Sequence, residues 1–330
     1  MFTKINLIKI VKRENIIVFG EPILLNHNDY GQVYQLDSDS GRLIVKIGFK
    51  EGEEAKIPGL GSHRLRNEIS FNNYLNKNKL TPKLIGFGEL KKPIKCSYLL
   101  YKEIDGDNLA RLIEKDLINF KMLKIFYFSM GQKLKIIHKI RLSSFGSLSN
   151  SYSDPKINWY DFISEVLTKC LAQMELGCFA DSIPVLKKYI DIKINLFKNV
   201  SITPRLLHGD YEAWNIIVKG EKIRGIIDGE FAFGGHNLID LVPELPFNLS
   251  DNKKKILKSK FLSGYFGNSK LSVWEKQCID FYYNIKMITH RMVVWEYFMK
   301  SADSQELKIE RKKIDMMLKE IKKQLNKSNI

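Results

Sequence analysis

The sequence predicts an α+β protein of two lobes, with a small N-terminal antiparallel sheet that carries one helix and a larger, mostly helical C-terminal lobe. Its 330 residues, 44% of them hydrophobic, are enough for two separate cores. Short strand-like segments occupy residues 16–47, and helical periodicity dominates beyond residue 109. We therefore expect an N-terminal lobe over residues 1–103 and a C-terminal lobe over 104–330, with a helical insert at about 156–200.

The N-terminal lobe is predicted from alternating apolar segments separated by turn-forming residues. The expected strands cover residues 16–19, 22–25, 33–36, 42–47 and 99–101. Between the last two, residues 63–76 place Leu65, Ile69 and Leu75 among charged side chains, a pattern typical of an amphipathic helix. The connection between the lobes is expected at residues 102–106.

The C-terminal lobe is predicted from longer segments of helical periodicity. Helices are expected over residues 109–140, 159–176, 183–198, 252–300 and 306–327, with a loop over 143–155 and two strands joined by a turn at 219–221. The last helix is charged and amphipathic, with apolar residues on one side: Ile309, Ile314, Met317, Leu318 and Ile321.

The formal charge of +16 is compatible with binding to nucleic acid or to a membrane surface. However, the lysines are scattered along the chain, and its richness in Asn, Ile and Lys is what the codon bias of an AT-rich genome produces. We therefore regard nucleic acid as an improbable partner. Because the sequence contains no apolar run of roughly 20 residues and no signal peptide at its start, no membrane association is expected.

The four cysteines show neither a CxxC pair nor a histidine at metal-ligand spacing. Neither a disulfide framework nor a zinc site is predicted. The cysteine pattern favours the reducing cytoplasm. The protein is expected to be a monomer.

The most informative segment is the run His-Gly-Asp-Tyr-Glu-Ala-Trp-Asn at residues 208–215, followed by Asp228 after an apolar hairpin. In phosphoryl transfer, one carboxylate receives the proton of the attacking hydroxyl, and further oxygen ligands hold Mg²⁺ against the phosphates. Each residue alone is most often a turn or cap residue. Together, Asp210, Asn215 and Asp228 predict a kinase.

These motifs resemble the aminoglycoside phosphotransferase and choline kinase group, small-molecule kinases that share the protein-kinase-like fold. The matching landmarks run from about Asn26 to Leu241. The resemblance implies that Asp210 is the catalytic acid/base residue and that Asn215 and Asp228 bind Mg²⁺. It also implies a nucleoside triphosphate as phosphate donor, expected to be ATP, with GTP possible.

The same resemblance suggests where the nucleotide binds. Lys46, in the strand 42–47, occupies the place of the lysine that holds the α- and β-phosphates, and Glu68 is its expected partner. The alternatives are a lysine that points to water from an edge strand and a solvated helix charge. Glu103, at the lobe connection, is assigned to the nucleotide site as well. Residues 26–34 hold one glycine where protein kinases show three, and backbone amides around Asn28 and Gly31 are expected to cover the phosphates.

The acceptor is expected to be a hydroxyl of an aminoglycoside-like antibiotic, which would make the protein a resistance factor. Such polycations need carboxylates, and Glu212, Glu230 and Asp240 are candidates, although the charge of +16 weighs against a cationic ligand. The alternative is a metabolic kinase acting on choline, a thiosugar or an amino alcohol. A macrolide phosphotransferase and a non-catalytic nucleotide-binding protein are less favoured.

One departure from the group lies downstream of these motifs. The group has a Gly-Asp-Pro run before an Asp-Leu pair, but this chain has His236 at the second position, ahead of Asp240. We expect this departure to affect loop architecture, and we expect Asp240 to bond loop amides.

Overall fold

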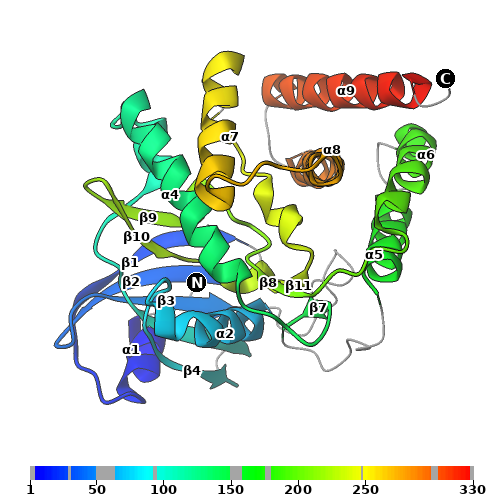
Figure 1. The fold of residues 1–330 in the computed structure, drawn as a ribbon. Coiled ribbons are helices and arrows are strands. Elements are labelled where there is room, and N and C mark those ends of the chain that lie inside the picture. Colours follow the sequence, from blue (N-terminus) through cyan, green and yellow to red (C-terminus); the bar gives the residue numbers. More distant parts are fainter. Residues whose placement is uncertain are drawn as a thin grey trace.

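A computed structural model describes residues 4–28, 31–49, 64–91, 95–148, 158–174, 180–246, 248–298 and 304–327. It shows the expected two lobes, with a sheet and two helices below a larger, mostly helical part in the view of Figure 1. The sheet of the first lobe has five antiparallel strands in the order β1-β2-β3-β5-β4. The elements of this lobe are α1 (Lys4–Lys12), β1 (Val18–Asn28), β2 (Gly31–Ser38), β3 (Leu43–Gly48), α2 (Arg64–Leu75), η1 (Asn76–Asn78), β4 (Leu84–Leu90) and β5 (Cys96–Lys102).

The first lobe contains two elements that the sequence patterns did not reveal. Helix α1 buries Leu7, Ile10 and Val11 with the sheet residues, so the expectation of a single helix was wrong. The apolar residues of α1 do have helical spacing. However, the segment is short and lysines interrupt it, so the pattern is weak. Strand β4 was missed because Gly86 and Gly88 interrupt its alternation. The two expected strands at 16–25 are one strand, β1, with bulges.

The second lobe combines helices with two small sheets, ordered β10-β9-β6 and β7-β11-β8. Its elements are β6 (Asp107–Asn108), α3 (Leu109–Glu114), α4 (Phe120–His138), β7 (Gly146–Ser147), α5 (Trp159–Met174), η2 (Ala180–Ser182), α6 (Ile183–Lys193), η3 (Ile194–Phe197), β8 (Arg205–Leu207), η4 (Ala213–Asn215), β9 (Ile216–Lys219), β10 (Lys222–Ile226), η5 (Gly229–Phe231), β11 (Phe233–Gly235), η6 (Asn237–Leu241), α7 (Asp251–Phe266), α8 (Val273–Phe298) and α9 (Ser304–Lys327).

Two segments expected as continuous helices are each divided into two helices, at residues that end one helix and cap the next. Residues 109–140 form α3 and α4, because Asp116 adopts a left-handed conformation (φ 52°) and Asn119 caps α4 by accepting the amide of Met122. Residues 252–300 form α7 and α8, because the chain turns at Gly267 (φ 66°) after α7. Ser272 and Glu275 then accept each other's amide protons, a capping box that begins α8.

Helices α4 and α7 cross at very close range, as Figure 1 shows. A Cβ atom on Gly131 would overlap the carbonyl oxygen of Phe261, and one on Gly264 would overlap that of Phe128. The two glycines therefore allow the helix backbones to touch. Helix α4 also lies against β8, the strand that leads into the His208 loop. The contact between α4 and α7 therefore helps to position this loop.

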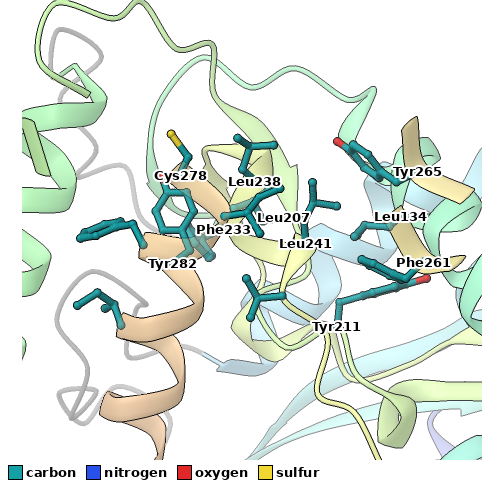
Figure 2. Packing of buried hydrophobic residues seen from close by; sticks show 14 of the residues in the cluster. Leu134, Leu207, Tyr211, Phe233, Leu238, Leu241, Phe261, Tyr265, Cys278 and Tyr282 are labelled. Carbon is teal, nitrogen blue, oxygen red and sulfur yellow. The ribbon is translucent and has the colours of Figure 1, made fainter. Parts of the chain in front are cut away.

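The larger core surrounds the loop after β8. Figure 2 shows Tyr211 beside Phe261 and Leu134, with Leu207 and Phe233 of the small sheet close by. Tyr211 is 1% exposed and donates its hydroxyl proton to the carbonyl of Met130 at 2.9 Å. The residue next to Asp210 is thus anchored in the core, which holds the loop in place.

The insert and the C-terminal helices pack on the far side of this core. Trp159 of α5 donates its indole proton to the hydroxyl of Tyr282 on α8 at 2.9 Å, so these aromatic residues are core residues. The expected apolar side of α9 is buried at Ile314 and Leu318, and α9 lies against α6 and α8. The side chain of Ile309 lies outside what the structure describes. In the described parts of the chain, each helix is either too short or too polar to cross a membrane.

Candidate active site

The loop after β8 is held from below by Asp240 of η6. Its carboxylate accepts the amide protons of His208 at 2.7 Å and Gly209 at 3.2 Å, and it lies 3.3 Å from Nε2 of His138. The expected bonding to loop amides is therefore observed. With its side chain 2% exposed, Asp240 does not face a substrate, and its assignment as a substrate residue was wrong.

His208 connects this loop to the strand that precedes Asp228. Its Nδ1 accepts the amide proton of Asp210 at 3.3 Å, so Nε2 carries the ring proton and donates it to the carbonyl of Ile227 at 3.0 Å. His208 is fully buried. It therefore supports the loop.

Asp210 and Asn215 face each other across the loop. The side-chain amide of Asn215 donates to Oδ2 of Asp210 at 2.9 Å and to its backbone carbonyl at 2.7 Å. Because the Asn215 nitrogen is used in this way, its amide oxygen is the atom left to act as a ligand. Burial raises the pKa of Asp210, and Glu212 raises it further, while Lys286 and His208 oppose the change. The Asp210 carboxylate is thereby more basic than an exposed one.

Asp228 follows the β9–β10 hairpin and lies close enough to Asp210 to raise its pKa. The hairpin pairs Ile226 with Ile216, and the Ile227 amide donates to the carbonyl of Asn215 at 2.9 Å. Asp228 has φ 65° and ψ 53°, a left-handed conformation that is uncommon for residues other than glycine. Such backbone strain is often found at functional sites.

Lys46 of β3 is surrounded by carboxylates. Its Nζ lies 2.8 Å from Oε2 of Glu68 and 2.8 Å from Oε2 of Glu230, and it is also bonded to Oδ1 of Asp228. The expected Lys46–Glu68 pair is thus present, and neither side chain is a solvated surface charge, with 17% and 4% exposed. Burial alone would lower the pKa of Lys46, but Asp228, Glu230 and Glu68 raise it well above its usual value.

Glu230 belongs to this cluster, and its carboxylate contacts Lys46 and Arg64 of the first lobe. Its second oxygen is 3.5 Å from the guanidinium of Arg64, and its backbone carbonyl accepts from the side chain of Asn67. The short η5 turn after Asp228 directs the side chain toward α2, so the sequence-based assignment to the acceptor was wrong. Burial raises the pKa of Glu68 to about 7, with Lys46 acting in the opposite direction.

The oxygen atoms at this site suit a magnesium ion. Among the described residues, Glu68, Asp228 and Glu230 each offer a carboxylate oxygen, and these atoms lie within 4.8 Å of one another. Lys46 bonds all three of these carboxylates. The carboxylate of Asp228 and the amide oxygen of Asn215 are oxygen ligands of the kind that Mg²⁺ prefers, so these two residues fit the ion.

The remaining nucleotide-site candidates lie along the first lobe. Asn28 pairs with Gly31 at the end of the β1–β2 hairpin, whose tip at residues 29–30 is outside the described residues. Glu103 follows β5, and its carboxylate binds the side chains of Gln35 at 2.6 Å and Arg42 at 2.7 Å. The side chain of Glu103 therefore ties the start of the lobe connection to the sheet of the first lobe.

One charged residue beside Asp210, Lys286, was missed. Lys286 of α8 places its Nζ 3.0 Å from Oε1 of Glu212, and Glu212 interacts with Glu244 as well. Burial raises the pKa of Glu212, Lys286 lowers it, and Glu244 raises it further. A lone lysine among apolar residues at 285–288 was the signal in the sequence, but only the fold brings it to the loop.

Comparison with protein families gives one match. The model of the phosphotransferase enzyme family matches residues 24–245. This range contains Lys46, Asp210, Asn215 and Asp228. A search by sequence among curated proteins gave no match.

Similar solved structures share this architecture. A thermostable mutant of aminoglycoside phosphotransferase APH(4)-Ia in its apo form is 11% identical, with a TM-score of 0.63, 94% of this chain covered and 97% of that chain. ADP-bound aminoglycoside phosphotransferase APH(2'')-Ib is 16% identical, with a TM-score of 0.58 and coverage of 96% and 97%. Spectinomycin phosphotransferase APH(9)-Ia in complex with ADP and spectinomycin is 18% identical, with a TM-score of 0.53 and coverage of 95% and 93%. These similarities confirm the predicted two-lobed kinase-like fold.

Proposed function

The chain belongs to the phosphotransferase enzyme family and is a small-molecule phosphotransferase, and we propose that it transfers the γ-phosphate of ATP or GTP to a hydroxyl of an aminoglycoside-like antibiotic. The observation that carries this proposal is the convergence of Asp210, Asn215 and Asp228 with the Lys46 cluster. These groups come from both lobes, and Asp228 lies close enough to Asp210 to raise its pKa.

Each residue has a role that follows from its surroundings. Asp210 orients the acceptor hydroxyl and accepts its proton, which its raised pKa favours. Lys46 holds the phosphates, and its ion pair with Glu68 keeps the ammonium aimed at them. Asn215 and Asp228 would hold Mg²⁺, which when bound supplies charge neutralisation for the phosphates.

The charge around Asp210 supports a cationic acceptor. Asp210, Glu212 and Glu244 are three carboxylates, whereas Lys286 is the cation that acts on both Asp210 and Glu212. The balance near the reacting hydroxyl is therefore negative, although the whole chain is positive. At physiological salt, charges farther than about 8 Å away are largely screened. The nearby carboxylates therefore determine whether the site attracts a cationic acceptor. Trp214, 47% exposed beside this loop, offers a ring face for stacking.

A metabolic acceptor with a single amine is the second candidate. The observation that favours it is the Lys286–Glu212 pair, which removes one carboxylate from those available to a polycation. Choline, a thiosugar or an amino alcohol would then be phosphorylated by the same residues.

The decisive experiment is a coupled nucleotide-turnover screen with ATP and GTP. The acceptors are aminoglycosides, macrolides, choline, small amino alcohols and thiosugars. Turnover stimulated by an aminoglycoside, together with resistance on expression, supports the first candidate, and turnover with an amino alcohol alone supports the second. Nucleotide hydrolysis that no acceptor stimulates would contradict both.

The role of Asp210 is tested in the same assay. Asp210→Ala is expected to lower acceptor-dependent turnover by a factor on the order of 10² to 10⁴, because the proton acceptor is lost, while nucleotide affinity persists. Asp191→Ala, at an exposed position on α6, is the matched control. Turnover at the wild-type rate in Asp210→Ala would contradict the assigned role.

A further inference from the structure

A cavity lies behind the active-site loop, between the ends of α4 and α7 and strand β8. It has a volume of about 270 Å³. Lys135 and Lys139 of α4 line it together with Arg205 of β8. Tyr265 and Ser269 line it from the α7 side. It is separate from the Lys46 cluster and from Asp210, neither of which lines it.

Three cations line this cavity. Burial raises the pKa of Tyr265 in its wall, and the carboxylates of Asp240 and Glu275 lie close enough to raise it further. Within the described part of the chain, no ion pair joins Lys135, Lys139 or Arg205 to a carboxylate. The C-terminal ends of α4 and α7 contribute about half a negative charge each. Three cations exceed these two helix ends by about two positive charges, so the helix dipoles do not account for all of them. Arg205 also donates to the carbonyl of Lys139 at 3.5 Å, which keeps it near the α4 end.

The cavity also offers neutral hydrogen-bond donors. The side-chain amide of Asn237 lines it and donates to the hydroxyl of Tyr265 at 2.8 Å, and Ser269 adds an exposed hydroxyl. Cations with converging neutral donors recognise phosphate oxygens through short charge-assisted hydrogen bonds. A volume of this size admits a small anion.

The wall of the cavity leads directly to the active-site loop. The Tyr265 hydroxyl bonds Nδ1 of His138 at 2.9 Å, and Nε2 of His138 lies 3.3 Å from Asp240. Asp240 in turn holds the amides of His208 and Gly209. A continuous series of buried hydrogen bonds therefore connects the cavity to the backbone that carries Asp210.

From this arrangement we propose that the cavity is a binding site for a small phosphate-bearing anion, and that its occupation stabilises the active-site loop through Tyr265, His138 and Asp240. A nucleic-acid backbone is a poorer fit, because the three cations converge on one cavity and do not form a row. This site is independent of the acceptor proposed above.

Binding is tested by calorimetric titration of inorganic pyrophosphate at constant ionic strength. The full-length protein is first saturated with magnesium and a non-hydrolysable nucleotide, so that the catalytic site is occupied. We expect one further site in the wild type and affinity weakened about tenfold or more in Lys135→Gln/Lys139→Gln/Arg205→Gln. The double variant Lys135→Gln/Lys139→Gln, at two exposed positions, is expected to weaken binding without disturbing the fold.

The matched control removes three positive charges elsewhere, in Lys187→Gln/Lys188→Gln/Lys198→Gln, and is expected to bind like the wild type. All three control positions are exposed. The absence of pyrophosphate binding in the wild type would overturn the proposal, as would equal weakening in both triple variants. Tighter, salt-steep binding of a single-stranded oligonucleotide to the same residues would overturn it in favour of nucleic acid.

The connection to the loop is tested by amide hydrogen exchange. Pyrophosphate is expected to slow exchange of the His208 and Gly209 amides, which donate to Asp240, in the wild type. In Tyr265→Phe, which lacks the hydroxyl that joins the cavity to His138, pyrophosphate is expected to bind without slowing this exchange. Unchanged exchange in the wild type, or equal slowing in both proteins, would overturn the coupling.

Discussion

Lys286 sets the charge that an acceptor meets at Asp210. In Lys286→Gln, the carboxylates of Glu212 and Asp210 lose their nearby cation. We expect the KM of a cationic acceptor to fall several-fold, because the acceptor's own ammonium group can take the place of the Lys286 ammonium beside Glu212. The KM of a neutral acceptor should stay constant. Steady-state kinetics with both kinds of acceptor measure this, and Glu212→Gln should act in the opposite direction. A raised KM for the cationic acceptor in Lys286→Gln would argue against the proposed charge balance.

His236 gives the folded protein a pH-dependent stability. Burial, with a further contribution from His138, lowers its pKa to about 3, while its ring bonds the hydroxyl of Tyr282 at 2.8 Å. The unfolded chain has a histidine pKa of about 6.5, so below that pH it binds a proton that the folded protein excludes. The contribution of His236 is therefore complete above pH 6.5 and is lost as the pH falls toward 3, by at most about 1.4 kcal/mol per pH unit.

Urea denaturation at pH 7, 6 and 5 checks this expectation. His236→Gln should flatten the dependence of the unfolding free energy on pH, even though the variant is less stable throughout. His27→Gln, at an exposed position, is the matched control and should keep the wild-type slope. Equal slopes in all three proteins would show that His236 is not the group responsible.

For single residues, the sequence correctly predicted contacts between residues that are close together along the chain. Asp210 and Asn215 are five residues apart in one loop, and the side chain of Asn215 does bond Asp210. Glu230 and Asp240 were assigned wrongly, because the partner of a carboxylate depends on which distant element lies against it. Their partners, Lys46 and His138, are remote in the sequence.

At the scale of elements, the contact between α4 and α7 determines where the loop can lie. In Gly264→Ala the new methyl group meets the backbone of Phe128, which cannot rotate away as a side chain would. Overpacking of this kind costs about 1–3 kcal/mol, which exceeds the gain of up to about 1 kcal/mol from replacing a helical glycine with alanine. We expect lower stability in urea denaturation, whereas Ser259→Ala, at an exposed position on α7, should change little. An unchanged midpoint in Gly264→Ala would contradict this close packing.

Strongly periodic elements were predicted well, and their ends were not. The expected helix at 63–76 corresponds to α2, and the expected turn at 219–221 joins β9 to β10. Periodicity continues across the breaks at 115–119 and 267–272, so it hides them. The capping box of Ser272 and Glu275 was a readable signal for the second break, whereas the left-handed conformation of Asp116 had no such signal.

At the scale of the whole molecule, the Lys46 cluster joins the two lobes. Lys46 comes from the sheet, Glu68 from α2 and Asp228 from the second lobe. A ligand bound there stabilises the folded protein as a unit, by about 2.7 kcal/mol at a concentration one hundred times its dissociation constant. We expect magnesium and nucleotide together to raise the melting temperature of the wild type, and removal of magnesium with a chelator to reverse most of that rise.

The Asp228→Asn variant tests whether this effect passes through the cluster. Asparagine tolerates a left-handed backbone conformation, so the fold should persist, but the charge that would attract the metal is lost. The melting-temperature rise with magnesium and nucleotide is expected to be much smaller than in the wild type, while Asp191→Asn should retain it. A full rise in Asp228→Asn would exclude this aspartate as a metal ligand.

Helix α2 belongs to the first lobe by sequence but is rooted in the core of the second. Its Phe71 and Leu75 are buried in the larger core, and Gly229 leaves room for the Phe71 ring. Leu65 of the same helix packs on Leu99 and Tyr101 of the sheet, so α2 has contacts with both lobes. If the lobes open and close with α2 held by the larger core, the sheet moves relative to α2. Glu68 would then remain near Asp228 while Lys46 moves away from both. The distance between Lys46 and Glu68 would therefore report the domain motion, and it can be followed with one spectroscopic label on β3 and another on α2.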